Sequence, residues 1–496
     1  MWRNPRFLPL LSGLLLTLSF PPFNLLLPPF FAVVFLLLFL ERTESTREVI
    51  AGALILGLVH YVSLLYWIVI FSWIGFFLLM GYLTFYPILW CLVHHYMWKR
   101  SRSLSLFIMP FSWVCFEYYR GIGELGFTWG QLAYSLTGFP ILLQFADTTG
   151  PYGVSFWIAA VNVLIYLAYR ATGSARRLLY LSMVVVSFAC AVAYGLAKYS
   201  TFEADGHINI AMVQPGLDQD VKWNPAFQDS TIMILSDLSR EVTDEETDLV
   251  IWPETAVPTY LKHDLLTMTL ISDLARELHS SIILGAPHYE VQEGEYRSFN
   301  IALYYDAEGM MSREVYKKIH LVPFGEKTPW EDRVEFLRNV DLGGGHFTSG
   351  TDFTIFRIDS VEIGTLICFE SIFPELSRSW RKKGADLLVN ITNDAWFKRT
   401  SAPYQHASAI VLRAIENRVS IARAANTGVT LTVDPLGRIG KFTRIFVRTT
   451  LSDRLPVSLR EKTIYTELGD FITIPCWIVF LCGLFAVRIM ETVDST

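Results

Sequence analysis

Three short segments of this 496-residue chain contain side chains that could together perform covalent catalysis. They carry the thiol of Cys368, the carboxylate of Glu254 and the amine of Lys318. A thiol needs a base to become a thiolate, and a nearby ammonium both lowers the pKa of the thiol and stabilises the oxyanion of a tetrahedral intermediate. Together the three side chains would supply a nucleophile, a proton acceptor and an electrophile.

Cys368 differs from the other cysteines in its surroundings. Residues 363–367 are apolar or β-branched, which predicts a buried strand that ends at Cys368. Open α/β sheets place reactive groups at this end of a strand. A thiol there is either a small apolar filler or a nucleophile, and the acid Glu370 two residues later favours the nucleophile. The remaining cysteines all lie in long apolar runs: Cys91, Cys115, Cys190, Cys476 and Cys482.

Each of the other candidates also has an ordinary structural interpretation. Glu254 could be a solvated acid after an apolar strand, Lys318 one of two adjacent surface lysines, and Glu326 a turn residue after Gly325. Most acids and lysines are solvated surface groups. The functional interpretation therefore depends on the joint occurrence of these residues at strand ends.

The elements that would position these residues fall between residues 199 and 470, where the composition is that of a soluble domain. Several predicted strands are almost wholly apolar and flanked by helices, while others come in pairs, which indicates a layered α/β sandwich rather than a purely parallel sheet. We predict strands over residues 208–213, 248–252, 281–285, 299–305, 354–358, 363–367, 386–391, 421–424 and 429–433. We predict helices over residues 229–242, 265–279, 373–383 and 404–417.

The rest of the chain has the composition of a membrane protein. The sequence is 52% hydrophobic and only 18% charged, against about 25% charged residues in soluble domains. Apolar runs that approach the ~20 residues of a membrane span predict a helical bundle of about eight spans, seven within residues 1–198 and one in the segment 471–496. The runs cover residues 7–20, 23–40, 50–70, 78–97, 104–118, 154–169, 178–196 and 471–487.

The basic residues predict the orientation of this bundle. Lys and Arg fall on alternate joints between the apolar runs, which places the amino terminus in the cytoplasm by the positive-inside rule. Seven spans then deliver residues 199–470 to the extracytoplasmic side. The joint over residues 117–150 holds Glu117, Arg120 and an aromatic run, and it is either a substrate-facing loop or an interfacial aromatic belt with an ion pair.

Composition and spacing exclude several functions. A net charge of -6 without a basic stripe argues against nucleic-acid binding. The histidines show no spacing typical of a zinc site, and the glycines at 343–345 lack the context of a phosphate loop. We expect no metal and no organic cofactor.

Three motifs resemble those of the nitrilase, or carbon-nitrogen hydrolase, superfamily. They are Trp-Pro-Glu-Thr at 252–255, His-Leu-Val-Pro-Phe-Gly-Glu at 320–326 and Asn-Asp-Ala-Trp-Phe at 393–397. Nearly the whole chain is similar to the bacterial apolipoprotein N-acyltransferase family, including Gly-Phe-Thr-Trp at 126–129 and Ala-Asp-Thr-Thr-Gly at 146–150. The resemblance implies a nitrilase-like α-β-β-α sandwich as the extracytoplasmic domain.

The resemblance also implies roles for individual residues. Glu254 would be the general base, Lys318 the cation that stabilises the oxyanion, and Cys368 the nucleophile. Lys318 is preferred to Lys317 because the family's lysine stands two residues before a His-Leu or Arg-Leu pair.

Four further residues match positions that support the site in this family. Glu326 and Glu370 match supporting acids, and Trp223 matches an aromatic residue that handles substrate. Phe369 occupies a position that is often tyrosine, so it keeps the aromatic surface but loses a hydroxyl.

The implied reaction takes place in the inner membrane of a bacterium, with the catalytic domain in the periplasm. An acyl chain would move from a membrane phospholipid, through a cysteine thioester, to the α-amine of the diacylglyceryl-cysteine of an apolipoprotein. A membrane-anchored nitrilase-type hydrolase and a transporter with a ligand-binding domain are the alternatives. Against transport, Lys, Asp and Glu are nearly absent from the predicted spans, and a hydrolase has no evident use for seven spans.

Overall fold

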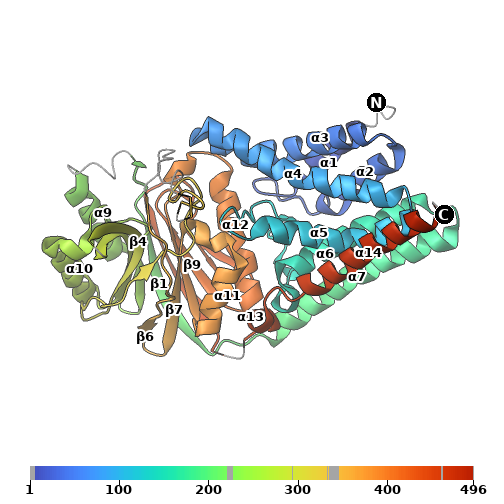
Figure 1. The fold of residues 1–496 in the computed structure, drawn as a ribbon. Helices are drawn as coiled ribbons and strands as arrows, with labels where there is room; N and C mark the ends of the chain where they lie inside the picture. The colour runs from blue at the N-terminus through green and yellow to red at the C-terminus, as the bar shows by residue number, and fades with distance from the viewer. Residues whose placement is uncertain are drawn as a thin grey trace. The chain divides into compact units, whose positions relative to one another are not determined.

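The protein folds into two compact units, as the computed structural model shows (Figure 1). One unit combines Met1–Thr201 with Leu468–Thr496, and the other is Phe202–Glu467. The structure describes residues 6–219, 227–292, 294–331, 333–334, 346–459 and 462–494.

The described part of the first unit contains helices and no strands. Each predicted apolar run contains a helix, and short 3-10 segments connect some of them. The helices are α1 (Phe7–Leu18), α2 (Pro29–Arg42), α3 (Thr46–Leu65), α4 (Trp73–Trp98), α5 (Arg102–Gly121), α6 (Ala146–Arg170), α7 (Ser174–Thr201) and α14 (Thr473–Asp494).

Five helical segments of the described chain are long and apolar enough to cross a membrane, which is fewer than the eight spans predicted. They are Thr46–Ile70, Trp73–Trp98, Ala146–Arg170, Ser174–Thr201 and Thr473–Thr492. Of the three other helices, α1 and α2 are short, whereas α5 has 20 residues and is not apolar enough. Helix α1 has 12 residues, or about 18 Å at 1.5 Å per residue, against a hydrocarbon core of about 30 Å. Helix α2 has 14 residues.

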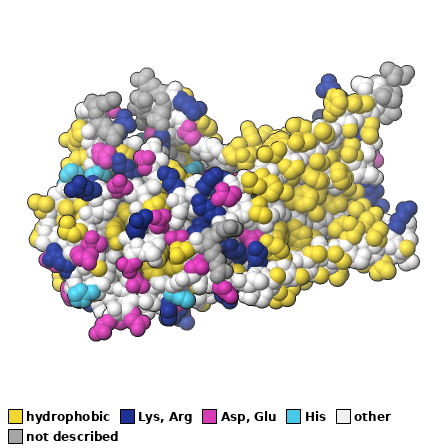
Figure 2. All heavy atoms as spheres, turned by 90° about the horizontal axis from the view of Figure 1, so that it is seen from below, with side chains coloured by type: hydrophobic (Ala, Val, Ile, Leu, Met, Phe, Trp, Pro, Cys, Tyr) yellow, Lys and Arg dark blue, Asp and Glu magenta, His cyan; other side chains and the backbone are white. Residues whose placement is uncertain are grey.

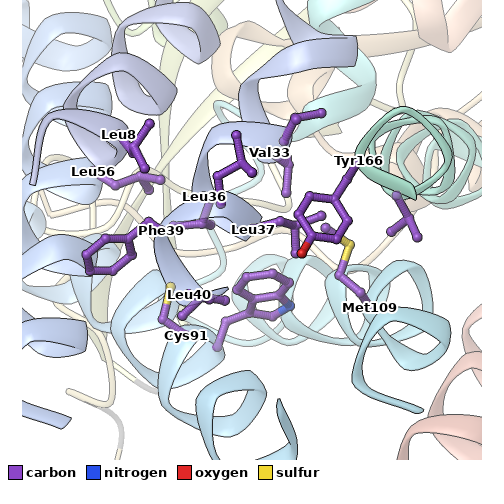
Figure 3. Packing of buried hydrophobic residues seen from close by; sticks show 14 of the residues in the cluster. Leu8, Val33, Leu36, Leu37, Phe39, Leu40, Leu56, Cys91, Met109 and Tyr166 are labelled. Atoms are coloured by element: carbon purple, nitrogen blue, oxygen red, sulfur yellow. The ribbon is translucent and has the colours of Figure 1, made fainter. Parts of the chain in front are cut away.

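Helix α2 lies at the centre of the helical core. Most of its side chains are buried on every face, as expected for a helix that is apolar all round. Figure 3 shows Leu36, Leu37 and Leu40 of α2 in a cluster with Cys91 from α4 and Tyr166 from α6.

The outer surface of this unit is apolar as well. In Figure 2 hydrophobic side chains cover most of its visible face, whereas Lys, Arg, Asp and Glu gather on the other unit. Helix α7 contributes Leu178 and Val185, which are 69% and 66% exposed. An apolar surface of this extent is a membrane surface, since soluble monomers rarely expose such large patches.

One buried amide ties α2 to α6. Asn162 of α6 accepts from the backbone N–H of Val33 at 2.9 Å and donates to the backbone carbonyl of Pro29 at 2.9 Å. These two backbone groups lie four residues apart at the start of α2. Asn162 therefore satisfies polar groups that have no access to water.

Replacing Asn162 with leucine should destabilise the helical unit by about 1 to 3 kcal/mol, because the buried hydrogen bonds that join α6 to the backbone of α2 are lost. The thermal unfolding midpoint of the detergent-solubilised protein measures this effect. Ser182→Ala is the matched control, since the exposed Ser182 donates only to a carbonyl of its own helix. Equal midpoints for Asn162→Leu and the wild type would refute this role.

The second unit contains two six-stranded sheets. Their orders are β12-β1-β2-β3-β4-β5 and β11-β10-β9-β8-β7-β6. The strands are β1 (Gly206–Gln214), β2 (Leu249–Ile251), β3 (Ser281–Gln292), β4 (Glu295–Tyr305), β5 (Tyr316–Lys317), β6 (Phe356–Ile358), β7 (Val361–Ile367), β8 (Leu387–Thr392), β9 (Ser420–Ala425), β10 (Leu431–Val433), β11 (Ile439–Phe442) and β12 (Thr449–Val457).

Both sheets combine a parallel centre with antiparallel edges. Strands β1, β2 and β3 are parallel neighbours, and so are β7, β8 and β9, with Ile363 opposite Leu387 and Leu387 opposite Ser420. The sequence analysis missed β5, β11 and β12. Strand β5 has only two residues, and the exposed and half-exposed positions of β11 and β12 give them little apolar patterning.

Helices cover the outer face of each sheet (Figure 1). Helices α9 (Gln228–Val242) and α10 (Leu265–Leu278) pack on the first sheet through a core that includes Leu235 and Leu274. Helices α11 (Pro374–Lys383) and α12 (Ala402–Asn417) cover the second sheet. The predicted α/β sandwich with two sheets is confirmed.

Candidate active site

Cys368 lies at the carboxyl end of β7, where the strand turns into the 3-10 segment η7 (Cys368–Ile372). Its φ of 53° lies in the left-handed region, which is strained for a side chain other than glycine. The backbone carbonyl of Cys368 accepts from the Ser371 hydroxyl at 3.0 Å and lies 3.1 Å from Nε2 of His406. These contacts hold the cysteine in a sharp bend at the strand end.

Glu254 follows β2 and is almost fully buried, with 6% of the residue exposed. One carboxylate oxygen accepts from Nδ2 of Asn300 at 2.8 Å, and the other accepts from the backbone N–H of Asn393 at 2.8 Å. Gly285 of β3 permits this packing, because a Cβ there would lie 2.7 Å from the Glu254 Cα. Glu254 is therefore a positioned buried acid and not a solvated loop residue.

Lys318 follows β5 and is 1% exposed, so it is not a surface lysine. Its Nζ lies 2.9 Å from both carboxylate oxygens of Glu326 and 3.6 Å from Oε1 of Glu254. Burial opposes the charged form, but the carboxylates of Glu326 and Glu254 attract the ammonium and raise the pKa of Lys318 above its usual value. The side chain thus carries a permanent buried positive charge.

Cys368 is half-buried, and its surroundings favour the protonated form of its thiol. Burial raises the pKa of this thiol well above its ordinary value. Glu254 raises the pKa further, and Lys318 lowers it. Attack by this sulfur therefore requires that a base take the proton as the new bond forms.

Glu370 binds the backbone segments that form the site and not the groups proposed to react. Its Oε1 accepts from the Tyr316 hydroxyl at 2.8 Å and from the backbone N–H groups of the two residues that follow Lys318. Its Oε2 accepts from the backbone N–H of Ile367 at 2.7 Å. Burial raises the pKa of Glu370 to about 7, against the effect of these donors. Glu370 links the lysine segment to the strand that ends at Cys368.

Phe369 and Trp223 complete the set of sequence-predicted residues. Phe369 is 8% exposed, and its ring meets that of Phe373 edge-on with centroids 5.1 Å apart. Phe369 thus contributes aromatic packing. Trp223 lies outside the described residues, as do the glycines at 343–345.

Sequence reasoning missed a buried ionic network behind Cys368. Asp394 lies 3.0 Å from Nδ1 of His406 and 2.8 Å from Nη2 of Arg423, and all three side chains are fully buried. Burial favours the neutral acid, but Arg423 and His406 lower the pKa of Asp394 to about 2. Asp394 belongs to one of the motifs noted in the sequence, whereas His406 and Arg423 come from α12 and β9 and gave no signal because only the fold brings them there.

The same residues supply the one group of potential metal ligands found in the described part of the chain. The ligand atoms of Cys368, Asp394 and His406 lie within 4.8 Å of one another. However, Arg423 Nη2 lies 3.1 Å from Nδ1 of His406 and already pairs with Asp394. A guanidinium thus occupies the position of a cation, and the group fits a structural ion pair better than a metal site.

Comparison with known proteins covers almost the full chain. Residues 12–164 match the apolipoprotein N-acyltransferase N-terminal domain family, and residues 209–463 match the carbon-nitrogen hydrolase family. An apolipoprotein N-acyltransferase of Geobacter metallireducens is 36% identical, with 96% of this chain and 93% of that protein covered. One from Chlorobaculum tepidum is 30% identical over 95% of this chain and 94% of its own.

Solved structures give a more distant similarity. Saccharomyces cerevisiae Nit3, a member of the nitrilase superfamily, is 18% identical with a TM-score of 0.39 over 51% of this chain and 91% of its own. An amidase of Nesterenkonia from the same superfamily is 17% identical with a TM-score of 0.40 over 56% of this chain and 99% of its own. Both scores are low, so the assignment to a family rests on the sequence matches.

The opposed effects of Glu254 and Lys318 on the thiol can be measured directly. Alkylation of Cys368 by iodoacetamide at mildly alkaline pH reports the thiolate fraction. Glu254→Gln removes the charge that raises the thiol pKa and should speed alkylation, whereas Lys318→Met should slow it, each by about tenfold or more for a shift of about one pKa unit. Mass spectrometry of the peptide that contains Cys368 separates this reaction from that of the exposed Cys190 and Cys482.

Lys317→Met is the matched control, because Lys317 pairs with Glu290 at 2.8 Å and not with Glu254. The rate at which Cys368 is alkylated in Lys317→Met should equal that in the wild type. The assignment of charges fails if Glu254→Gln and Lys318→Met change the rate in the same direction.

Proposed function

The chain belongs to the apolipoprotein N-acyltransferase family, and we propose how it acts as an N-acyltransferase. It transfers an acyl chain from a membrane phospholipid to the N-terminal α-amine of the S-diacylglyceryl-cysteine of an apolipoprotein. Two observations support the proposal. Nζ of Lys318 lies 3.6 Å from Oε1 of Glu254, and both side chains shift the pKa of the Cys368 thiol.

In the first step the sulfur of Cys368 attacks the carbonyl carbon of a phospholipid ester. Glu254 takes the thiol proton as the carbon–sulfur bond forms, and Lys318 stabilises the negative charge on the carbonyl oxygen. The ester carbon–oxygen bond then breaks. The leaving alkoxide takes the proton from Glu254 and departs as a lysophospholipid, leaving a thioester on Cys368.

In the second step the free α-amine of the apolipoprotein attacks the thioester. Glu254 accepts a proton from the attacking nitrogen, and Lys318 again stabilises the oxyanion. Collapse of the intermediate breaks the carbon–sulfur bond, and the sulfur regains a proton from Glu254. One base and one cation thus serve both halves of a ping-pong reaction.

Exposed aromatic side chains support lipid contact by the catalytic domain. Phe324, Trp330 and Trp396 are 42%, 40% and 52% exposed, so they are not core residues. Phe324 and Trp330 also have positive φ values of 60° and 61° in loops that follow β5. Aromatic loops of this kind rest on a bilayer or enclose an acyl chain, and either arrangement keeps water from the thioester.

The transfer reaction is tested by supplying phospholipid with a labelled acyl chain together with a synthetic diacylated lipopeptide. The wild type should add one acyl chain to the α-amine, as read by lipopeptide mass. Lys318→Met should reduce the rate by about 100-fold or more, as expected for the loss of an oxyanion-stabilising group, and Lys317→Met should leave it near the wild-type value.

The products also separate the alternative functions. Labelled free fatty acid without acylated lipopeptide would instead identify a membrane-anchored hydrolase. The absence of any lipid turnover would favour a ligand-binding or transport protein.

We also propose that the catalytic domain is periplasmic and that both chain termini are cytoplasmic, which requires that all seven helices α1 to α7 cross the membrane, the shorter ones included. Arg42, Arg102 and Arg177 lie at or near helix ends that this orientation places in the cytoplasm. Reporter fusions at these three positions should be active as cytoplasmic reporters, and a fusion near Asp218 should be active only as a periplasmic one. A cytoplasmic reporter signal at Asp218 would contradict the orientation.

A further inference from the structure

The last turns of α5 bury a pair of charged residues inside the helical unit. Arg120 is only 4% exposed, and Glu117 is half-buried one turn earlier. These residues were expected in a connecting loop or belt, but the helix continues to Gly121. Ionisable groups within a membrane bundle are energetically costly and usually serve a function.

Among the described residues, the guanidinium of Arg120 makes a hydrogen bond on one side and none on the other. Its Nη1 donates to the Tyr61 hydroxyl at 2.6 Å. Its Nε and Nη2 have no hydrogen-bond partner. These two nitrogens lie on one edge of the guanidinium, where their N–H bonds are parallel. Such an edge can bind two oxygens of one anion.

Glu117 does not supply those oxygens. Its Oε1 accepts from the indole N–H of Trp113 at 3.0 Å and from the backbone N–H of Leu132 at 2.8 Å. Its Oε2 makes no hydrogen bond of normal geometry in the described structure, although the Ser155 hydroxyl lies near the carboxylate. No ion pair among the described residues joins Glu117 to Arg120. The cluster therefore presents a free two-pronged donor beside a free acceptor.

Both residues line a cavity of about 70 Å³. At about 10 to 15 Å³ for each water, this space holds roughly five waters, which is enough for a phosphate group and its nearest substituent. The rest of the wall is largely apolar and comes from the surrounding helices, with Leu16, Leu36, Leu56, Trp90 and Phe116 among its residues.

In the cavity wall, the backbone at Gly130 lies very close to helix α3. Gly130, with a φ of 76°, packs against α3 so tightly that a Cβ would lie 2.9 Å from Leu64 Cδ2. The loop after α5 thus closes on α3 next to Tyr61. The fold builds a defined enclosure around the charged groups.

We propose that this cavity binds the phosphodiester of a membrane phospholipid. Nε and Nη2 of Arg120 donate to two phosphate oxygens, and Oε2 of Glu117 accepts from a hydroxyl or ammonium of the head group. Apolar walls suit the adjoining part of the lipid, and a phosphodiester is the anion that a bilayer supplies in quantity. The site uses no residue of the catalytic domain and does not depend on acyl transfer.

The test measures lipid retained by the full-length protein in detergent, with phosphatidylglycerol as the probe and native mass spectrometry as the readout. Cys368→Ala serves as the parent, so that no lipid is consumed. Adding Arg120→Gln should weaken the binding of one lipid by about tenfold or more, since a charged two-bond contact is lost. Adding Arg177→Gln, which removes an exposed cation of α7, should leave binding unchanged.

Equal retention by the parent and the Arg120→Gln variant would overturn the proposal and identify a cavity that holds water only. Inorganic phosphate is the second probe. If it displaces the lipid at equal concentration and its own binding is lost with Arg120, the ligand is a free anion and the assignment to a lipid is wrong.

A measurement on the parent protein covers the case in which Arg120→Gln does not fold. A phosphatidylglycerol with a photoreactive group near its phosphate should label the inward side chains Tyr86 and Trp90 of α4, and unlabelled lipid should compete. Labelling confined to Phe77 and Leu78, which are 66% and 68% exposed on the same helix, would show surface lipid alone and refute the site.

Discussion

The catalytic domain depends on the pairing of the Lys318 ammonium with the carboxylates of Glu326 and Glu254. All three groups are largely removed from water, with side-chain exposures of 1%, 15% and 8%. A buried charge is stable only when it is paired, and removing one partner of such a pair typically costs about 3 to 5 kcal/mol. The same attraction that keeps Lys318 charged fixes its distance from Glu254. The attraction that stabilises this part of the domain therefore also keeps the proposed electrophile charged.

The thiol reaches this charge cluster through a second set of constraints. Glu370 links the end of β7 to the segment that carries Lys318, and the carbonyl of Cys368 lies against His406 of the Asp394 network. These bonds maintain a cysteine with a φ of 53°, a conformation that costs energy in isolation. The strain is retained because the surrounding polar network is buried and well satisfied. The domain thus positions the proposed nucleophile, Cys368, by contacts that take no part in the proposed reaction.

Much of the site could be predicted because strand ends leave a local signature. Apolar stretches followed by Glu254 and Cys368 placed both residues correctly at the ends of β2 and β7. The roles of Asp394, His406 and Arg423 could not be predicted, since their contact depends on how α12 and β9 pack. Five of the eight predicted spans have the length and composition of a membrane-crossing helix, and the apolar runs alone did not reveal that α1 and α2 are short. Arg120 was predicted to lie in a connecting loop, because its charge ended the apolar run before the end of the helix.

In the proposed reaction Cys368 carries the acyl chain between donor and acceptor. The most direct test is the intact mass of the purified enzyme over time, first with phospholipid alone and then with a diacylated lipopeptide added. We expect a hydroxylamine-sensitive mass increase equal to one acyl group on Cys368, which disappears when the lipopeptide is added and does not form in Cys368→Ala. Acyl transfer to the lipopeptide by Cys368→Ala at the wild-type rate would contradict it.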